Sequence, residues 1–153
     1  MTEHALIEVP RGLNGVAVAS TEIGDVRGDE GFYHYRGHDA VALARTRSFE
    51  DVWHLVARGE LPNQAAGAAF TCEVAQARIL PDALATMIPV IAAQPGTVTD
   101  HLRAVFGLAG GALGLGALVD LAPGARADQA LRLAAVVPSA VGACTAPAPA
   151  GHW

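Results

Sequence analysis

The sequence predicts a mainly α-helical protein that opens with a small β-hairpin at about residues 15–36. Three observations support this fold class. Hydrophobic residues make up 52% of the 153 residues and charged residues 16%, which is typical of a chain with a buried core rather than of a disordered one. Strand-like alternation occurs only near the front of the chain. From Ser48 onward, apolar residues recur at helical spacing between capping and stop signals.

The hairpin is predicted from three strand-like stretches, which are VAVAS at 16–20, EIGDV at 22–26 and FYHYR at 32–36. Between the last two lies RGDEG, in which Gly28 and Gly31 flank two acids, and this composition favours a tight turn. Alternation in the third stretch places Tyr33 and Tyr35 on one face of the strand. The opposite face would carry three side chains, Phe32, His34 and Arg36.

The first helices are predicted from their capping residues. The carboxylate of Asp39 can accept the free amide protons of a short helix that reaches Leu43. Ser48 and Asp51 form a variant of the capping box at the start of the next helix, and Gly59 can end that helix. Four apolar residues are expected to share its buried face: Phe49, Val52, Trp53 and Val56.

Two further helices are marked by proline and asparagine. Pro62 and Asn63 open a helix that is expected to run to about Ile79. Residues 80–96 predict another helix with Pro89 inside it, where we expect a kink or an early break because proline has no amide proton to donate. The apolar face of the first of these helices consists of Ala66, Phe70, Val74 and Ala77.

The last helices are less regular in sequence. Thr99 or Asp100 is expected to cap a helix within residues 100–121, although glycines weaken the second half of this segment as a helix. A final helix is expected at about 127–137, and Pro138 is expected to stop it.

The length of the chain predicts one domain rather than two. Within residues 1–153, we expect the hairpin at 15–36 and the helices over 39–143. Residues 144–153, which are rich in alanine and proline, are expected to form a frayed tail.

Charge and composition indicate a cytoplasmic protein that binds neither nucleic acid nor a membrane. The formal net charge is −5 and no arginines cluster, whereas such binders need gathered cations. The amino terminus lacks the basic start and apolar core of a signal peptide, and the apolar run at about 104–119 is too short to span a bilayer. Cys72 and Cys144 lack metal-binding spacing, and we expect them to be reduced and buried.

The sequence offers no catalytic, cofactor-binding or metal residue by spacing alone. His34 and His38 would lie about 13 Å apart in an extended strand, too far to share a metal ion. The glycine-rich run at 107–116 follows a helical pattern rather than a strand, so a phosphate-binding loop is not expected there. We therefore assign no site residues and no cofactor. The aromatic stretch GFYHYRGHDA at 31–40 is interpreted as a structural hairpin.

Residues 12–39, GLNGVAVASTEIGDVRGDEGFYHYRGHD, resemble the opening of the citrate synthase family. Members have a glycine-led strand, a T-x-I-x-x-x-x-G segment and a hairpin that ends in YRG before an aromatic residue. Tyr35, Arg36 and Gly37 match this pattern, whereas His38 stands where tyrosine is usual. Three later segments are similar to the next helices of the family, in the same order: 48–62, 100–110 and 130–143.

The resemblance implies a citrate synthase-like helical body, of which this chain would be the N-terminal part of the large domain, and a homodimer. It also implies condensation of acetyl-CoA or another acyl-CoA with oxaloacetate, to citrate or methylcitrate. In the family, an aspartate and two histidines perform this chemistry and arginines hold the substrate. No position of this chain matches those later motifs, and four of its histidines fall outside them: His34, His38, His54 and His101.

We therefore expect the N-terminal segment of a citrate synthase-like acyltransferase that is inactive as it stands, with acyl-CoA and oxaloacetate bound only by a complete parent. Its partners would be a second copy or a full-length citrate synthase-like subunit. An alternative is a non-catalytic helical protein that binds such a subunit. A third possibility is a product of a decayed gene with no stable fold.

Overall fold

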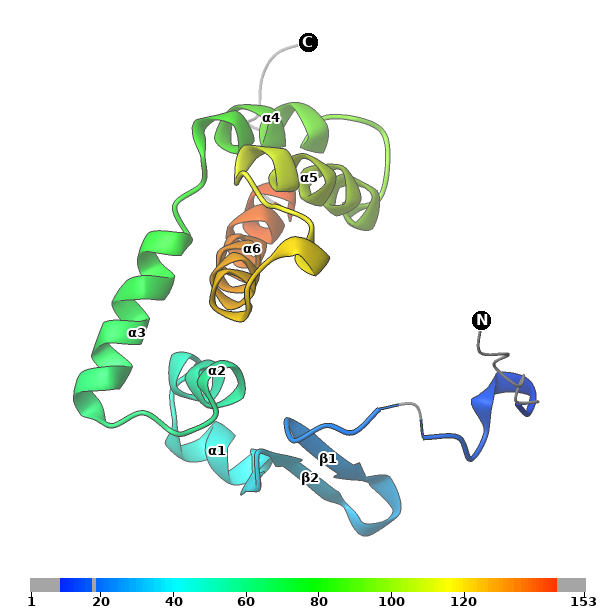
Figure 1. Ribbon diagram of the computed structural model, residues 1–153. Coiled ribbons are helices and arrows are strands. Elements are labelled where there is room, and N and C mark those ends of the chain that lie inside the picture. Colours follow the sequence, from blue (N-terminus) through cyan, green and yellow to red (C-terminus); the bar gives the residue numbers. More distant parts are fainter. Residues whose placement is uncertain (1–8, 18, 146–153) are drawn as a thin grey trace. The chain divides into compact units, whose positions relative to one another are not determined.

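The computed structural model describes residues 9–17 and 19–145. Within this part, the chain is mainly helical, as the sequence predicts. It forms two compact units that are divided between Arg47 and Ser48. The first unit contains a small antiparallel sheet and one α-helix, and the second contains the remaining α-helices (Figure 1).

The sheet of the first unit has the strand order β1-β2-β3, with all neighbours antiparallel. Strands β1 (Gly24–Arg27) and β2 (Phe32–Tyr35) form the predicted hairpin. Their turn is the 3₁₀ helix η2 (Gly28–Glu30), and Gly31 follows it with a φ of 64°. Glycine adopts this left-handed conformation without a steric penalty, which explains why the turn ends there.

The structure corrects two expectations for the front of the chain. The described residues of 16–20 form no strand, whereas a separate 3₁₀ turn, η1 (Arg11–Leu13), precedes them. Apolar alternation alone does not make a strand when no neighbouring strand supplies hydrogen bonds. A short third strand, β3 (His38–Asp39), was not predicted, because a two-residue strand has no periodicity of its own.

The first helix, α1 (Ala40–Thr46), is capped as predicted. The Asp39 carboxylate accepts a hydrogen bond from the amide of Ala42 at 2.7 Å. The helix runs one turn beyond Leu43, the predicted end, and Leu43 itself is buried.

The second unit begins with α2 (Phe49–Arg58), which has the predicted capping box. Asp51 donates its amide to the Ser48 hydroxyl at 3.1 Å, and its carboxylate accepts the Ser48 amide at 3.3 Å. The predicted apolar face is wrong in one respect, because Phe49 is 67% exposed and Leu55 is the buried residue. The ring of Phe49, in the first turn of α2, meets that of Trp53 edge to face, with 5.8 Å between the centroids.

Helix α3 (Gln64–Ala77) is capped by Asn63, whose side chain accepts the amide of Ala66 at 2.9 Å. Phe70 and Val74 are buried, as predicted. They form a small cluster with a residue of the last helix, Leu131, against which Trp53 and Ala77 also pack. This cluster is where α2 and α3 join the rest of the unit.

Helices α4 (Asp82–Ala92) and α5 (Val98–Ala112) form the next pair. Pro89 lies inside α4 without ending it. The cap of α5 is Thr97 and not Thr99 or Asp100, because Asp100 occupies the third helical position and bonds back to the Thr97 amide. The glycine-rich segment ends the helix at Ala112, as its composition suggested.

The last helix, α6 (Pro123–Thr145), is twice the predicted length, and a 3₁₀ turn, η3 (Leu118–Asp120), precedes it. Pro138 does not stop it. A buried stripe continues on both sides of this proline, and burial of its apolar surface outweighs one missing hydrogen bond. The stripe consists of Leu131, Ala135, Val136, Ala140 and Cys144. The tail predicted for 144–153 is thus helical at Cys144 and Thr145, and residues 146–153 lie outside the described part.

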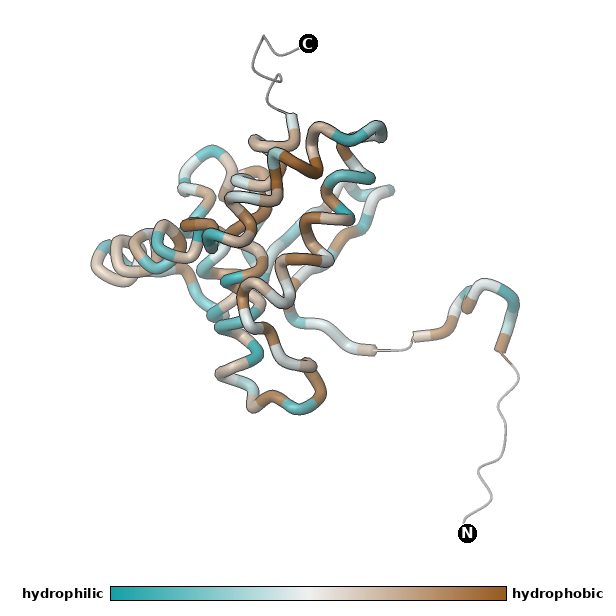
Figure 2. The backbone as a smooth tube through the Cα atoms, turned by 90° about the horizontal axis from the view of Figure 1, so that it is seen from above, coloured by the Kyte–Doolittle hydropathy of each residue, from teal (hydrophilic) through white to brown (hydrophobic). Residues whose placement is uncertain are grey.

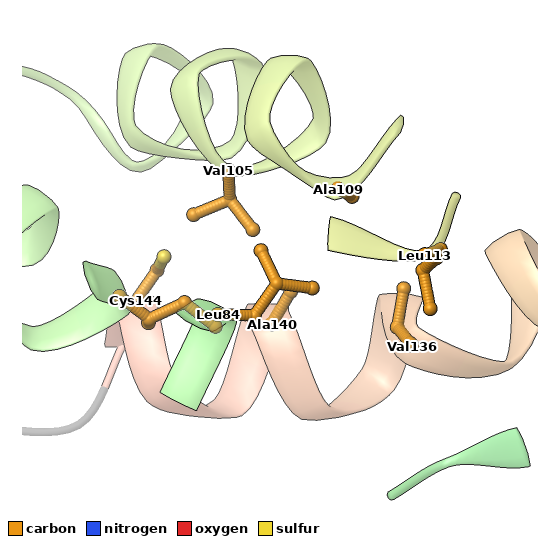
Figure 3. Packing of buried hydrophobic residues seen from close by; sticks show 8 residues of the cluster. Leu84, Val105, Ala109, Leu113, Val136, Ala140 and Cys144 are labelled. Carbon is orange, nitrogen blue, oxygen red and sulfur yellow. The ribbon is translucent and has the colours of Figure 1, made fainter. Parts of the chain in front are cut away.

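The main core lies among α4, α5 and α6, and Figure 3 shows its packing. Side chains from the three helices meet there, and Val105 of α5 points toward α6. Figure 2 shows hydrophobic residues at intervals along the helical tubes, separated by more polar ones. The cluster consists of Leu84, Ile88, Val105, Ala109, Leu113, Val136, Ala140 and Cys144.

Candidate functional site

A group of aromatic and titratable side chains lies on one face of the hairpin. The guanidinium of Arg27 lies 3.8 Å from the ring centroid of Phe32, and the His34 ring stacks on Phe32 at 3.8 Å. The Nε2 atom of His34 is 4.0 Å from a carboxylate oxygen of Asp39 on β3. Arg27 is also paired with two acids, Asp25 at 3.6 Å and Glu30 at 2.9 Å. The charged and polar side chains of this face are therefore paired with one another or stacked on Phe32.

The opposite face carries Tyr33 and Tyr35, as alternation predicts. Their rings meet edge to face, with 5.1 Å between centroids, and their hydroxyls share a hydrogen bond. That hydrogen bond raises the pKa of Tyr33 above its ordinary value of 10.0. A tyrosine in this state is a neutral hydrogen-bonding group at pH 7 and gives up its proton less readily than an unperturbed one. The pairing therefore favours a structural role for the two rings.

The prediction for His34 and His38 needs a correction, because the chain between them turns instead of extending. Arg36 and Gly37 both have positive φ values, 45° and 81°. Strand β2 consequently ends at Tyr35, so Arg36 is not part of it as expected, and β3 folds back so that Tyr35 lies opposite His38. The described residues contain no group of three or more histidine, cysteine or acidic side chains that could hold a metal ion.

Two further histidines are engaged with backbone carbonyls. The Nδ1 atom of His54 lies 2.9 Å from the Glu60 carbonyl, and the ring edge meets Phe70. The Nε2 atom of His101 lies 2.9 Å from the Gln94 carbonyl, and only 9% of this residue is exposed. A carbonyl only accepts, so these nitrogens carry the protons. Both rings therefore tie a helix to a loop that follows or precedes it.

The helix start that holds His101 also holds an acid with several hydrogen bonds, Asp100. Asp100 accepts the Thr97 hydroxyl at 2.7 Å, the Thr97 amide at 3.0 Å and the Arg103 guanidinium at 2.7 Å. The hydrogen bonds from Thr97 hold the pKa of the Asp100 carboxyl below its ordinary value of 3.8, and the charge of His101 acts in the same direction. An acid in this state is a cap for α5 and a weak proton acceptor.

Ion pairs connect α2 to α3. Arg58 pairs with Glu73 at 3.0 Å, and Arg78, at the end of α3, pairs with Glu50 at 2.9 Å. The Ser139 hydroxyl of α6 donates to the backbone carbonyl of Arg78 at 3.4 Å. These contacts hold α2, α3 and α6 together. They could not have been predicted from the sequence, because the paired residues lie far apart along the chain.

The two cysteines are both free, but they differ in exposure. Cys144 is buried in the main core, as predicted, whereas Cys72 is exposed on α3. Cys72 falls on the side of α3 away from Phe70 and Val74, which explains why the expectation of burial fails for it.

The described helices include none that is both long and apolar enough to cross a bilayer by itself. Helices α3 and α4 pass the same length and hydropathy test only when they are taken together, and they are bent by 63° with respect to each other.

Comparison with known proteins gives one consistent result. Residues 12–148 match the family model described as citrate synthase, C-terminal domain. The chain is 36% identical to the citrate synthase of Haloferax volcanii over 96 residues, which are 63% of this chain and 25% of that protein. It is 35% identical to the 2-methylcitrate synthase of Shewanella oneidensis over 82 residues, 54% of this chain and 22% of that one.

A third relative, the citrate synthase of Synechocystis sp., is 35% identical over 74 residues, which are 48% of this chain and 18% of that protein. The chain thus spans a quarter or less of the length of the curated relatives that it matches. The matched family model covers the hairpin and every described α-helix. The chain therefore belongs to the citrate synthase family.

Proposed function

We propose that this chain is the N-terminal segment of a citrate synthase-like acyltransferase. The observation that carries the proposal is the match of residues 12–148 to the family model, which includes most of both compact units. The complete parent would condense acetyl-CoA or another acyl-CoA with oxaloacetate, giving citrate or methylcitrate, in the cytoplasm. Such a reaction needs a base for a weak carbon acid and a hydrogen-bond donor for the enolate oxygen.

The N-terminal assignment rests on the YRG hairpin and the capped helix at 48–62, which resemble the family's opening. The description of the matched model names a C-terminal domain, so the position of this segment within a parent is part of the proposal. We also propose that the described residues act as a single partial domain of that parent, although they form two compact units.

We further propose that the chain by itself does not catalyse the condensation. The contacts of its described polar residues support this view. His54 and His101 are bound to backbone carbonyls, and Asp100 is held by Thr97 and Arg103. None of these side chains is free to remove a proton from a thioester and return it.

The test is an assay for free thiol released from acetyl-CoA, with and without oxaloacetate, by the purified 153-residue chain. We expect no oxaloacetate-dependent release, while the citrate synthase of Haloferax volcanii, assayed in parallel, releases thiol. Release that needs both substrates and scales with the concentration of this chain would show that it is an enzyme in its own right.

A second candidate function is that of a non-catalytic helical protein that binds a full-length citrate synthase-like subunit. Large apolar side chains that remain exposed in the second unit favour it, because such surface is usually covered in a working protein. The most exposed of them are Phe49, Ile79, Leu118 and Val119. Binding of the purified chain to a full-length family member, measured by calorimetry, would support this candidate.

A further inference from the structure

The chain has two asparagines, Asn14 and Asn63, and their surroundings differ. Asn14 is exposed and precedes a glycine, and its side-chain amide has no hydrogen-bond partner among the described residues. Asn63 precedes Gln64, and its side-chain oxygen accepts the amide of Ala66 as the cap of α3. One side chain is therefore free to react, whereas the other is held by a helix.

Asn14 and Gly15 form the centre of a turn that follows η1, at the blue end of the chain in Figure 1. Asn14 has a φ of −59° and a ψ of 124°, and Gly15 has a φ of 74°, as in a type II turn. The amide of Val16 donates to the Leu13 carbonyl at 3.0 Å and closes the turn. The amide of Gly15 donates to no described residue, so its nitrogen is not held in a hydrogen bond.

Little else holds this turn in place. Residues 9–15 are all exposed, so opening the turn uncovers no buried core. Leu13, at its start, has a φ of 57°, which is unfavourable for a residue with a Cβ atom. Segments with few buried apolar contacts are the ones that open most readily in native proteins. The turn therefore leaves its closed conformation at little cost in free energy.

We propose that Asn14 is a site of spontaneous covalent modification, at which the side-chain amide is lost as ammonia. The backbone nitrogen of Gly15 attacks Cγ of Asn14, and the new C–N bond closes a five-membered succinimide ring. The Cγ–NH₂ bond breaks, and the departing group takes up the proton of the Gly15 amide. Water then opens the ring at either carbonyl, which gives aspartate or isoaspartate without any change of oxidation state.

The structure explains why this reaction belongs to Asn14 and not to Asn63. Ring closure requires the Cα–C bond of Asn14 to rotate away from its ψ of 124°, and this rotation breaks only the hydrogen bond that closes the turn. No side chain on Gly15 shields the attacking nitrogen. At Asn63, ring closure would break the cap of α3, and the side chain of Gln64 would stand beside the nitrogen.

The modification would change both charge and backbone at the front of the chain. Either product adds one negative charge to a chain whose formal net charge is −5. Isoaspartate also places its side-chain carbons in the main chain, which becomes one atom longer, so the type II turn cannot close in the same way. Residue 14 lies within the segment that matches the family model, but the chemistry does not depend on the proposed function.

The test is incubation of the full 153-residue chain in mildly alkaline buffer, followed by trypsin digestion and mass spectrometry. Cleavage after arginine gives the peptides 12–27 and 59–78, which contain one asparagine each. We expect conversion at Asn14 to be at least about tenfold faster than at Asn63, because the helix cap must open before Asn63 reacts. Electron-based fragmentation distinguishes isoaspartate from aspartate, and only the ring gives isoaspartate.

The variant Gly15→Ala keeps Asn14 and places a methyl group beside the attacking nitrogen. We expect it to slow conversion at least about tenfold, because that methyl group shields the nitrogen. The matched control is Gly12→Ala, since Gly12 and Gly15 both have a positive φ and an added Cβ would meet nothing within 4 Å at either position. Any loosening of the turn by strain speeds the reaction, so Gly12→Ala should not slow it.

Three outcomes would overturn the inference. Conversion at Asn63 as fast as at Asn14 would show that the turn has no special reactivity. Aspartate without isoaspartate would show that no ring forms, and an undiminished rate in Gly15→Ala would show that its nitrogen is not the attacking group. The thiol-release assay of the proposed function is independent of all three.

Discussion

At the scale of single residues, glycines at helix ends and glycines inside helices have opposite effects on stability. Gly59 follows α2 with a φ of 101°, and its amide donates to the carbonyl of Leu55. Gly107 lies inside α5, and a methyl group added to it would meet nothing within 4 Å. The left-handed conformation at Gly59 requires glycine, whereas glycine at position 107 only lowers the helix propensity of α5.

This contrast gives a matched prediction. Gly59→Ala should destabilise the protein by about 1–2 kcal/mol, because alanine in the left-handed region brings its Cβ too close to the following carbonyl. Gly107→Ala should stabilise it by about 0.5–1 kcal/mol, because alanine has less backbone freedom to lose on folding. Urea unfolding of both variants beside the wild type measures the two free energies, and effects of the same sign would refute the assignment of the two conformations.

Residue chemistry also explains which local features the sequence could predict. Capping is decided within four residues, so Asp39, Ser48 and Asn63 were all identified from the sequence as helix starts. The cap of α5 was misplaced by two or three residues, because Thr97, Thr99 and Asp100 all have side chains that can cap a helix. Only the geometry shows that Asp100 acts as the third-position partner of Thr97.

At the scale of elements, the two prolines inside helices are the clearest departure from local rules. Pro89 lies within α4 and Pro138 within α6, and both are exposed. Each removes one amide donor from its helix, yet the apolar stripe on the other side of the helix continues. Burial against neighbouring helices depends on residues far away in the sequence. For this reason, local sequence signals predicted an end of α6 that was too early.

Replacement of these prolines should therefore stabilise the helices. We expect Pro138→Ala to raise the free energy of unfolding by about 2 kcal/mol, since the restored hydrogen bond and relief of the ring clash exceed the lost restriction of the unfolded chain. Pro89→Ala should act in the same direction on α4. Thermal unfolding followed by circular dichroism measures both changes, and a lower midpoint for Pro138→Ala would mean that the proline is required for the packing of α6.

Strands were harder to predict than helices for a related reason. A strand exists only where another strand pairs with it, so Val16 and Ala17 form none despite suitable residue types. The contacts of the candidate site likewise depend on residues that are distant in the sequence. The interpretation of 31–40 as a structural hairpin stays a prediction. The contacts among Arg27, Phe32, His34 and Asp39 depend on strand pairing, and the positive φ of Arg36 before β3 could not be predicted from local sequence.

At the scale of the whole molecule, the division between Arg47 and Ser48 should be visible to a protease. Arg45 and Arg47 are exposed beside this boundary. Brief treatment with trypsin should therefore release a long-lived fragment that begins at Thr46 or Ser48, because the helices beyond it share a core. Mass spectrometry of the time course identifies the fragment.

The control for this prediction is the double variant Arg45→Gln, Arg47→Gln, in which trypsin cannot cut at the boundary and the fragment should not form. Equally early cleavage at Arg58 or Arg103 in the wild type would indicate that the second unit is not independently compact. It would also agree with the expectation from chain length that the described residues are one domain.

The hydrogen bond between Ser139 and the Arg78 carbonyl joins residues 61 positions apart, and the cluster of Phe70, Val74 and Leu131 joins the same two helices. The packing of α4 on α5 and of α5 on α6 instead joins consecutive α-helices, and these two steps bring α4 to α6 without closing one long loop at once. Closing a long loop costs more entropy than closing a short one, and non-local contacts slow folding. The three-helix core should accordingly assemble early, and attachment of α3 to α6 should be the late, rate-determining event in the folding of this unit.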